Sequence, residues 1–363
     1  MKKRILTMVL ACLCLVAMTF STAMAADEGQ ESYSMIMLNT ALGIEFCNLE
    51  GEGGQQAADE LGNVQLEYRA PQDPTDLTIQ PDAIRTAMTQ GVDAILLACI
   101  DYGAVEEVLT EAMNDGIPIV TFDIRLPDAP DGMVSTNVCT DNIAAAGLAA
   151  EKMMEEENFR AAIENASVEE PVVVVCAVND VNSNTMIDRG NGFVQAMKSY
   201  AEEYHPGAVA VTGSDVFAEE SAEPAAVEIY VSVPATTSAA DCLTAAQNYI
   251  GMDGLMGVFC NNEVMVNSLL SATNDGMDLD RENGKYSHIL AAGFDAGTTL
   301  KNAVRNQWFY GAVSQDPVTM GYEAVMSAYN IIQGEQVNDI DPGAVWYNSE
   351  NMDEPDIEIL LYD

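Results

Sequence analysis

Short apolar runs alternate with amphipathic stretches along most of the chain. Near-continuous apolar runs are typical of strands buried on both faces of a parallel sheet, whereas apolar residues three or four apart indicate helices. The runs predict ten strands, at residues 33–39, 64–70, 92–100, 117–123, 132–138, 171–178, 227–233, 256–262, 288–295 and 310–316. The amphipathic stretches predict helices at residues 81–91, 104–116, 142–157, 188–204, 238–251, 263–276, 298–307 and 319–334.

This alternation predicts an α/β fold. Ten strands are too many for one comfortable sheet, so we expect two Rossmann-like lobes, each with a parallel sheet covered by helices. The predicted helix ends support this fold. Thr140 or Asp141 can cap the helix that begins at Asn142, and Gly116 and Gly334 can end the helices at residues 104–116 and 319–334. Ligands of open α/β sheets bind beyond the carboxyl ends of the strands, so a cleft between two lobes is the expected site.

The first 25 residues have the pattern of a secretory signal peptide. A basic start at Lys2, Lys3 and Arg4 precedes an apolar stretch over residues 5–20, and Ala-Met-Ala at 23–25 is a small-x-small cleavage site. The apolar stretch is short for a membrane anchor, and residues 9–12 resemble a lipoprotein box only vaguely. We therefore expect a periplasmic or extracellular protein with no stable membrane insertion after cleavage, and lipid anchoring remains the less favoured alternative.

The net charge limits the kinds of partner that the protein can bind, and the cysteine pattern indicates whether disulfides or metal sites are expected. The formal net charge of −43 would repel nucleic acid phosphates and anionic lipid headgroups, so nucleic acid binding is excluded. Six cysteines follow the predicted signal peptide, and export with an even number would favour disulfides. However, Cys99, Cys176 and Cys260 lie inside apolar strand-like runs, where cysteine behaves as a small hydrophobe. We expect mostly free thiols, and without a C-x-x-C spacing we expect no metal site and no cofactor.

Enzyme motifs are scarce. The chain has no G-x-S-x-G elbow, no H-E-x-x-H and no phosphate-binding G-x-x-x-x-G-K-[ST] loop. Its only histidines, His205 and His288, have no neighbouring nucleophile in sequence. The expected class is therefore a binding protein and not an enzyme.

Polar residues gather where the predicted strands end. Residues 117–125 (IPIVTFDIR) run apolar and then end at Asp123 and Arg125, and residues 288–297 (HILAAGFDAG) repeat the design at Asp295. Carboxylates accept hydrogen bonds from sugar hydroxyls, guanidinium and amide groups donate to them, and an aromatic ring can lie on the apolar face of a sugar. The same carboxylates could instead cap turns. The candidate ligand-binding residues are Phe46, Asp101, Asp123, Arg125, Asn142, Arg189, Asn262, Asp295 and Gln315.

Several motifs together resemble a known family. The pieces, in order, are GGQQAADELG, GVDAILLACIDYGAVEEVLTEAMNDGIPIVTFD, STNVCTDNIAAAGLAAEKM, DRGNGF, GVFCNNEVM, AAGFDAG and GAVSQDPVTMGYEAV, followed by IIQGEQV. Their order resembles the type I periplasmic substrate-binding proteins of sugar ABC transporters, the ribose and galactose group, which share their fold with LacI-type effector domains. The resemblance covers roughly residues 33–337.

The resemblance implies two lobes joined by a three-stranded hinge. Its implied boundaries are residues 33–139 with 316–343 for the N-terminal lobe, and 140–315 with 344–363 for the C-terminal lobe. It also assigns ligand positions to Asp123, Asn142, Arg189, Asn262, Asp295 and Gln315.

The chain departs from the family pattern at three places. Residues 44–47 (IEFC) stand where an Asn-Pro-Phe-Phe loop is usual, so one aromatic is lost. Ile124 occupies the usual arginine position, and residues 234–238 lack an aromatic often found there.

The function expected from these observations is capture of a monosaccharide or related polyol, which the protein delivers as a monomer to an ABC transporter permease. An alternative is a periplasmic sensor component that presents a sugar or furanosyl signal to a receptor. A less favoured one is a secreted glycosidase that uses Asp123 and Asp295 as paired carboxylates.

Overall fold

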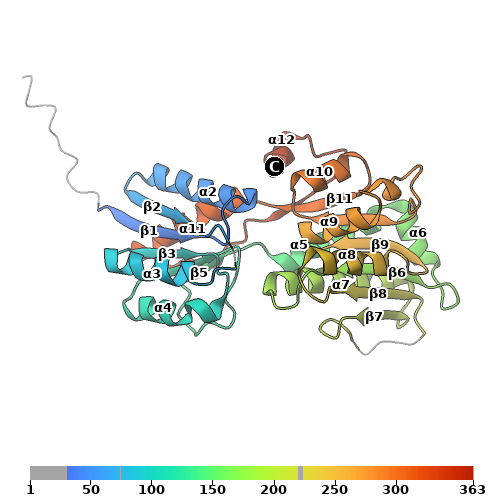
Figure 1. Cartoon of the computed structure of the whole chain (residues 1–363), viewed down its shortest axis with the longest axis horizontal. Coiled ribbons are helices and arrows are strands. Elements are labelled where there is room, and N and C mark those ends of the chain that lie inside the picture. Colours follow the sequence, from blue (N-terminus) through green and yellow to red (C-terminus); the bar gives the residue numbers. More distant parts are fainter. Residues whose placement is uncertain (1–30, 74, 220–223, 363) are drawn as a thin grey trace, which may run out of the picture.

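The computed structural model describes residues 31–73, 75–219 and 224–362, so the predicted signal peptide lies outside the described residues. Two α/β bodies lie side by side along the long axis of the molecule (Figure 1). Each is built on its own sheet, and all strand pairs within the two sheets are parallel except β11 with β12. The predicted α/β fold with two parallel sheets is confirmed.

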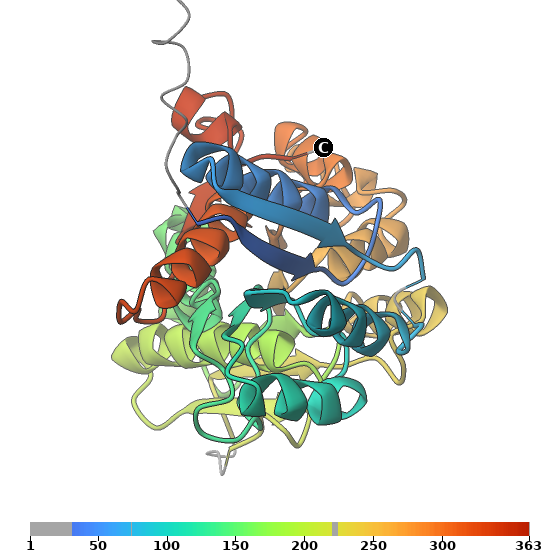
Figure 2. The same ribbon diagram turned by 90° about the vertical axis from the view of Figure 1, so that its left-hand side faces the viewer.

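The first sheet has five strands in the order β2-β1-β3-β4-β5. Their bounds are β1 Tyr33–Leu38, β2 Val64–Arg69, β3 Ala94–Leu97, β4 Ile119–Phe122 and β5 Thr136–Val138. The helices that cover it are α2 Glu45–Leu61, α3 Ile79–Gln90, α4 Tyr102–Asn114 and α11 Pro317–Ile332. Apolar residues of α3 and α4 pack on one face, and those of α2 and α11 pack on the other (Figure 2).

The second sheet has seven strands in the order β12-β11-β10-β9-β6-β8-β7. Their bounds are β6 Val172–Ala177, β7 Val209–Gly213, β8 Val227–Ser232, β9 Leu255–Cys260, β10 Leu290–Phe294, β11 Gly311–Gln315 and β12 Ala344–Tyr347. Its covering helices are α5 Asn142–Glu155, α6 Glu157–Asn165, α7 Asn184–Tyr204, α8 Ala239–Tyr249, α9 Glu263–Ala272 and α10 Thr298–Arg305. A 3₁₀ turn, η1 Met277–Leu279, and a short helix, α12 Pro355–Glu358, complete the described elements.

Three segments connect the two bodies: β5 to α5, β11 to α11, and the chain between α11 and β12. The first and third lie together, because the backbone N–H of Ile340 donates to Asn137 O at 2.8 Å and that of Cys139 donates to Ile340 O at 3.0 Å. After β12 the chain returns past α12 and ends beside the junction of the bodies (Figure 1).

Two glycines let α2 and α11 pack at backbone distance. A Cβ added at Gly53 would lie 2.0 Å from Val318 O, and one at Gly321 would lie 1.8 Å from Glu50 O. Real Cβ atoms do not approach that closely, so each position requires glycine. The glycine-rich stretch at residues 51–54 is therefore a helix-packing surface of the first body.

Local predictions about helix ends and cysteines are confirmed. Asp141 caps α5 by accepting from the N–H of Ala144 at 2.9 Å, and Gly116 and Gly334 both take the left-handed conformation after their helices. The six cysteines that the structure describes are all buried free thiols.

Candidate functional site

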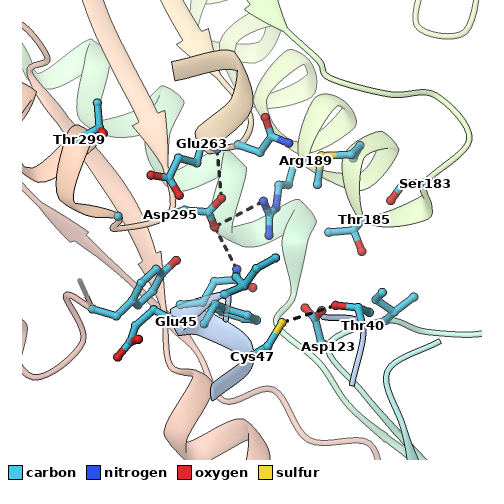
Figure 3. Close-up of a pocket in the computed structure, with 18 of the residues that line it drawn as sticks. Thr40, Glu45, Cys47, Asp123, Ser183, Thr185, Arg189, Glu263, Asp295 and Thr299 are labelled. Carbon is cyan, nitrogen blue, oxygen red and sulfur yellow. Dashed lines mark hydrogen bonds and ion pairs between the residues drawn. The ribbon is translucent and has the colours of Figure 1, made fainter. Parts of the chain in front are cut away.

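A cavity of about 620 Å³ lies between the two bodies. Its wall on the side of the first sheet comes from Thr40, residues 44–47, Asp123 and Ile124. The opposite wall comes from Ser183, Thr185, Met186, Arg189, Asn262, Glu263, Asp295, residues 297–299, Gln315 and Tyr362. Most of these follow the carboxyl end of a strand or begin a helix, which is where ligands of open α/β sheets bind. Figure 3 shows the two groups of side chains facing each other.

Arg189 lies on the second wall, and its guanidinium group contacts four other residues. Its Nε donates to Asn142 Oδ1 at 2.8 Å, and Nη1 donates to the backbone oxygen of Asn261 at 3.1 Å. Nη1 also lies 3.7 Å from Asp295 Oδ1, and the guanidinium carbon lies 3.7 Å from the centre of the Phe294 ring. Burial lowers the pKa of Arg189, and the neighbouring carboxylates act against that shift. The guanidinium is therefore positioned before any ligand enters.

Asp295 collects several donors at the end of β10. Its Oδ2 accepts from the backbone N–H of Glu263 at 3.3 Å, and Oδ1 accepts from Gln315 Nε2 at 3.3 Å (Figure 3). Burial, and then the charge of Asp295, raises the pKa of Glu263. Glu263, Arg189 and Gln315 thus organise around one carboxylate.

Asp123 stands on the first wall with fewer partners. Like Asp295, it has a positive φ, 59° against 83°, at the turn that follows its strand. Burial raises the pKa of Asp123 to about 6; the charge of Arg189 lowers it and that of Asp295 raises it. No side chain or backbone group in the described part of the chain donates a hydrogen bond to its carboxylate, so the group is available to a ligand.

An aromatic corner closes one side of the cavity. Phe46, near the start of α2, meets Tyr362 edge to face, with ring centroids 5.8 Å apart and planes inclined by 68°. Tyr362 reaches the cavity because the preceding segment is anchored: Ser314 Oγ donates to Leu360 O at 2.7 Å. Two rings in this arrangement present an apolar surface on which a sugar ring can lie.

The structure brings six of the predicted ligand residues to the cavity wall. They are Phe46, Asp123, Arg189, Asn262, Asp295 and Gln315. Asn262 also caps α9, because its Oδ1 accepts from the N–H of Met265 at 3.1 Å.

Three predicted residues lie outside the wall. Asp101 caps α4, accepting from the N–H of Ala104 at 2.8 Å, and is exposed. Arg125 is exposed and close enough to Asp188 that its charge lowers the pKa of that carboxyl against the effect of burial. Asn142 is buried behind Arg189 and positions it.

Several wall residues were not predicted. They are Thr40, Ile44, Glu45, Cys47, Ile124, Ser183, Thr185, Met186, Glu263, Gly297, Thr298, Thr299 and Tyr362. Glu263 directly follows Asn262, and residues 297–299 begin two positions after Asp295, so extending each strand-end motif by a few positions would have found them. Nothing local marks Tyr362, which lies far from the other wall residues in sequence.

Behind the first wall lies a buried acid that sequence patterns also missed. Glu50 is fully buried; Oε2 accepts from Asn39 Nδ2 at 2.7 Å, and Oε1 has no hydrogen-bond partner in the described residues. Burial, and then the charge of Asp123, raises its pKa well above the usual range. Burial and the nearby Asp123 carboxylate thus both favour the protonated form of Glu50.

In the described residues, no three His, Cys, Asp or Glu side chains are arranged to hold a metal ion. Of the helices in the same residues, none is long and apolar enough to cross a membrane.

Two α/β lobes with a polar cavity between them define a two-lobed binding protein of type I topology. The family model for the periplasmic binding protein domain matches residues 35–336, so the chain belongs to that family. The resemblance predicted from the sequence motifs is confirmed.

Known relatives agree with this membership. The galactofuranose-binding protein YtfQ of Escherichia coli is 28% identical over 174 residues, and the match spans 46% of this chain and about half, 51%, of the relative. The ribose import binding protein RbsB of Bacillus subtilis is 25% identical over 263 residues, covering 72% of this chain and 70% of the relative.

Solved structures share the fold. One from Brachyspira murdochii, described as an ABC transporter, LacI family transcriptional regulator, has a TM-score of 0.78 at 27% identity and covers 92% of this chain and 99% of its own. An ABC transporter solute-binding protein from Agrobacterium vitis with bound D-fucose has a TM-score of 0.68 at 21% identity, covering 91% and 100%.

Proposed function

We propose that this chain is an exported solute-binding protein that captures a monosaccharide or related polyol and delivers it to an ABC transporter permease. The observation that carries the proposal is the cavity lined by polar side chains from both lobes. The names of the relatives support the ligand class, since ribose import and galactofuranose binding are their stated roles. The proposed setting is the periplasm or cell exterior, reached by the signal peptide at residues 1–25, where the protein works as a monomer.

The side chains of the cavity suit a ligand rich in hydroxyl groups. Asp123, Glu263 and Asp295 accept hydrogen bonds, Arg189 donates them, and Asn262 does both. A buried polar group left without its partner costs about 1–3 kcal/mol. A missing or inverted hydroxyl on the ligand should therefore lower the binding affinity markedly.

We propose that binding closes the two lobes about the three connecting segments. The lobes are residues 33–139 with 316–343, and residues 140–315 with 344–363. A ligand that touches Asp123 on one wall and Asp295 on the other binds the closed state more tightly than the open one. It therefore shifts the population toward closure.

We propose binding without catalysis. A glycosidase needs one carboxyl group free to donate a proton and a second free to attack or to activate water. Asp295 is instead occupied by Arg189 and Gln315, which hold it as an acceptor.

The test is a thermal-shift screen of the mature protein against pentoses, hexoses, polyols and nucleosides, followed by calorimetry on each hit. We expect at least one sugar or polyol to raise Tm by several degrees and to bind with a one-to-one stoichiometry. Asn262→Ala removes a cavity side chain and should weaken that binding at least tenfold, whereas Asp128→Asn, in an exposed loop, should leave it unchanged. A folded protein that binds no member of the panel, or that hydrolyses aryl glycosides, contradicts the proposal.

A further inference from the structure

The charge of the cavity is unbalanced. Four carboxylates line it, from Glu45, Asp123, Glu263 and Asp295, and Arg189 is the one cation among the described wall residues. A neutral sugar supplies hydroxyl donors but no charge. Closing the lobes on such a ligand would remove water from several carboxylates without neutralising them, which is costly for each group left unpaired.

Arg189 offsets the charge of Asp123 only in part: it lowers the pKa of that carboxyl, but no ion pair joins the two side chains in the described residues. Its side chain is only 4% exposed, and its Nη1 is directed at Asn261 O and at Asp295 Oδ1. These contacts, with the one to Asn142, fix the guanidinium on the second wall. Its charge is therefore used mainly by Asp295.

Among the described residues, the first wall contains no cation that could compensate Asp123. The next residue, Ile124, also faces the cavity but is apolar, and Arg125 is exposed beside Asp188. Behind the wall lies Glu50, another carboxyl group, whose Oε1 is buried without a hydrogen-bond partner in the described residues. Asp123 thus presents a carboxylate that feels the charge of Arg189 but forms no ion pair with any cation of the described residues.

We propose that the ligand is a monosaccharide or polyol bearing a protonated amine, and that the ammonium group binds at the Asp123 carboxylate. The inference rests on the proposed function and specifies its substrate class. An ammonium group supplies three donors and the missing positive charge in one small group, and ionised hydrogen bonds are roughly twice as strong as neutral ones. Uronic acids and sugar phosphates are rejected by the same carboxylates.

The aromatic rings and the second wall provide the remaining contacts to such a ligand. The ring face lies against Phe46 and Tyr362, and the remaining hydroxyls reach Arg189 and Asn262 on the second wall. Asp123 and the second wall face each other across the cavity (Figure 3), so an amine at one end of the ligand and hydroxyls at the other would bridge the lobes.

The experiment compares matched pairs by calorimetry. The probes are D-glucosamine with D-glucose, D-galactosamine with D-galactose, D-mannosamine with D-mannose, and 6-amino-6-deoxy-D-glucose with D-glucose, each also against its N-acetylated form, which keeps the nitrogen and removes the charge. We expect at least one amine to bind at least tenfold more tightly than both of its neutral partners. If every neutral sugar binds as tightly as its amine or more tightly, the inference is overturned while the proposed function stands. If no probe of either kind binds but a pentose or polyol of the screen does, the inference is again overturned while the proposed function stands. If the folded protein binds neither a probe nor any member of the screen, both fail.

Variants locate the ammonium group. Asp123→Asn keeps the size of the side chain and removes its charge, so it should weaken binding of the amine far more than binding of its neutral partners and reduce the amine preference to about twofold or less. Ile124→Arg adds a cation beside the carboxylate and should reduce the preference in the same way, through the opposite chemical change. Asp128→Asn, in the exposed loop after Asp123, serves as the matched control and should preserve the preference. A preference that survives in both cavity variants overturns the assignment to Asp123.

Discussion

Asp123 and Asp295 come from the same local design and end in different chemical states. Each follows a buried strand that ends in Phe-Asp, and each takes a positive φ at the turn. Asp295 accepts from Gln315 and from a backbone N–H and lies beside Arg189, whereas Asp123 has no donor in the described residues. The comparison shows that a shared motif fixes where a carboxylate stands, while long-range partners decide whether it is already neutralised.

The difference assigns separate tasks to the two walls. The second wall is organised before binding, because its hydrogen bonds link α5, α7, β10 and β11 around Arg189 and Asp295. The first wall offers the carboxylate of Asp123, which has no donor in the described residues, and the ring of Phe46. A ligand therefore gains affinity by completing the first wall and orientation by fitting the second.

Of the variants proposed here, removal of Arg189 should have the largest effect on stability and sugar binding. Arg189→Met keeps most of the bulk but leaves Asp295 without its cation and Asn142 without its donor. Breaking one partner of a buried pair typically costs about 3–5 kcal/mol. We expect a loss of that size in the free energy of unfolding, measured by urea denaturation, together with loss of sugar binding.

The matched control is Arg160→Met, which removes an exposed i,i+4 pair with Glu164. Such pairs contribute about 0.3–0.5 kcal/mol, so this variant should be nearly as stable as the parent. Equal stability of the two variants would contradict the central role of Arg189.

The sequence predicts the features of the fold and the site that depend on local patterns. The buried strands of both sheets follow from their apolar runs, and the strand ends place Asp123, Asn262 and Asp295 at the cavity. Edge strands β7 and β12 were missed, because each lies at the margin of the seven-stranded sheet and lacks a long apolar run. A position at the edge of a sheet is set by tertiary packing and leaves a weak local pattern.

Tertiary structure explains two predicted residues that lie outside the cavity wall and one wall residue that was not predicted. Asp101 follows a strand as Asp123 does, but the helix after it starts at once, so its side chain is used as an N-cap. Arg125 comes two residues after a positive-φ turn, so adjacency in sequence does not place it with Asp123 in space. Tyr362 is absent from any local motif, because only the packing of the final segment brings it to Phe46.

Neutralising Asp295 should have the next largest effect. Asp295→Asn keeps an acceptor oxygen but removes the carboxylate that acts most strongly on the buried guanidinium of Arg189. We expect a loss of about 2 kcal/mol in the free energy of unfolding at neutral pH, a typical cost for a buried charged hydrogen bond left unmade. Urea denaturation measures it, and a variant as stable as the parent would show that Asp295 is not the partner that stabilises Arg189.

Neutralising Asp123 should have the opposite sign. Its pKa in the folded protein, about 6, lies above the ordinary value of 3.8, so the folded state binds more protons than the unfolded state between these pH values. Stability contributed by this group therefore falls as pH rises from about 4 to 6, and the cost is complete above that window. After allowance for solvent in the cleft, Asp123→Asn should stabilise the ligand-free protein by about 1–2 kcal/mol at pH 7.5.

The measurement is the difference in unfolding free energy between parent and Asp123→Asn at several pH values, which cancels the titration of other groups. The difference should shrink toward zero below about pH 4. A destabilised Asp123→Asn at pH 7.5 would mean that the carboxylate already has a partner, and the contrast with Asp295 would be lost.

The smallest effect concerns the aromatic corner formed by Phe46 and Tyr362, where the charge of Asp295 acts on the Tyr362 hydroxyl. Tyr362→Ala removes the ring that meets Phe46 edge to face, a contact of a kind that contributes about 0.5–1.5 kcal/mol beyond area burial. We expect the affinity for the best sugar of the screen to fall about three- to tenfold, as measured by calorimetry, with Tyr362→Phe closer to the parent because it keeps the ring. Tyr204→Ala, at an exposed tyrosine on α7 outside the cavity wall, should leave the affinity unchanged. If Tyr362→Ala binds like the parent, the Tyr362 ring contributes no surface to the ligand, and Phe46 is the one ring of the corner left to support it.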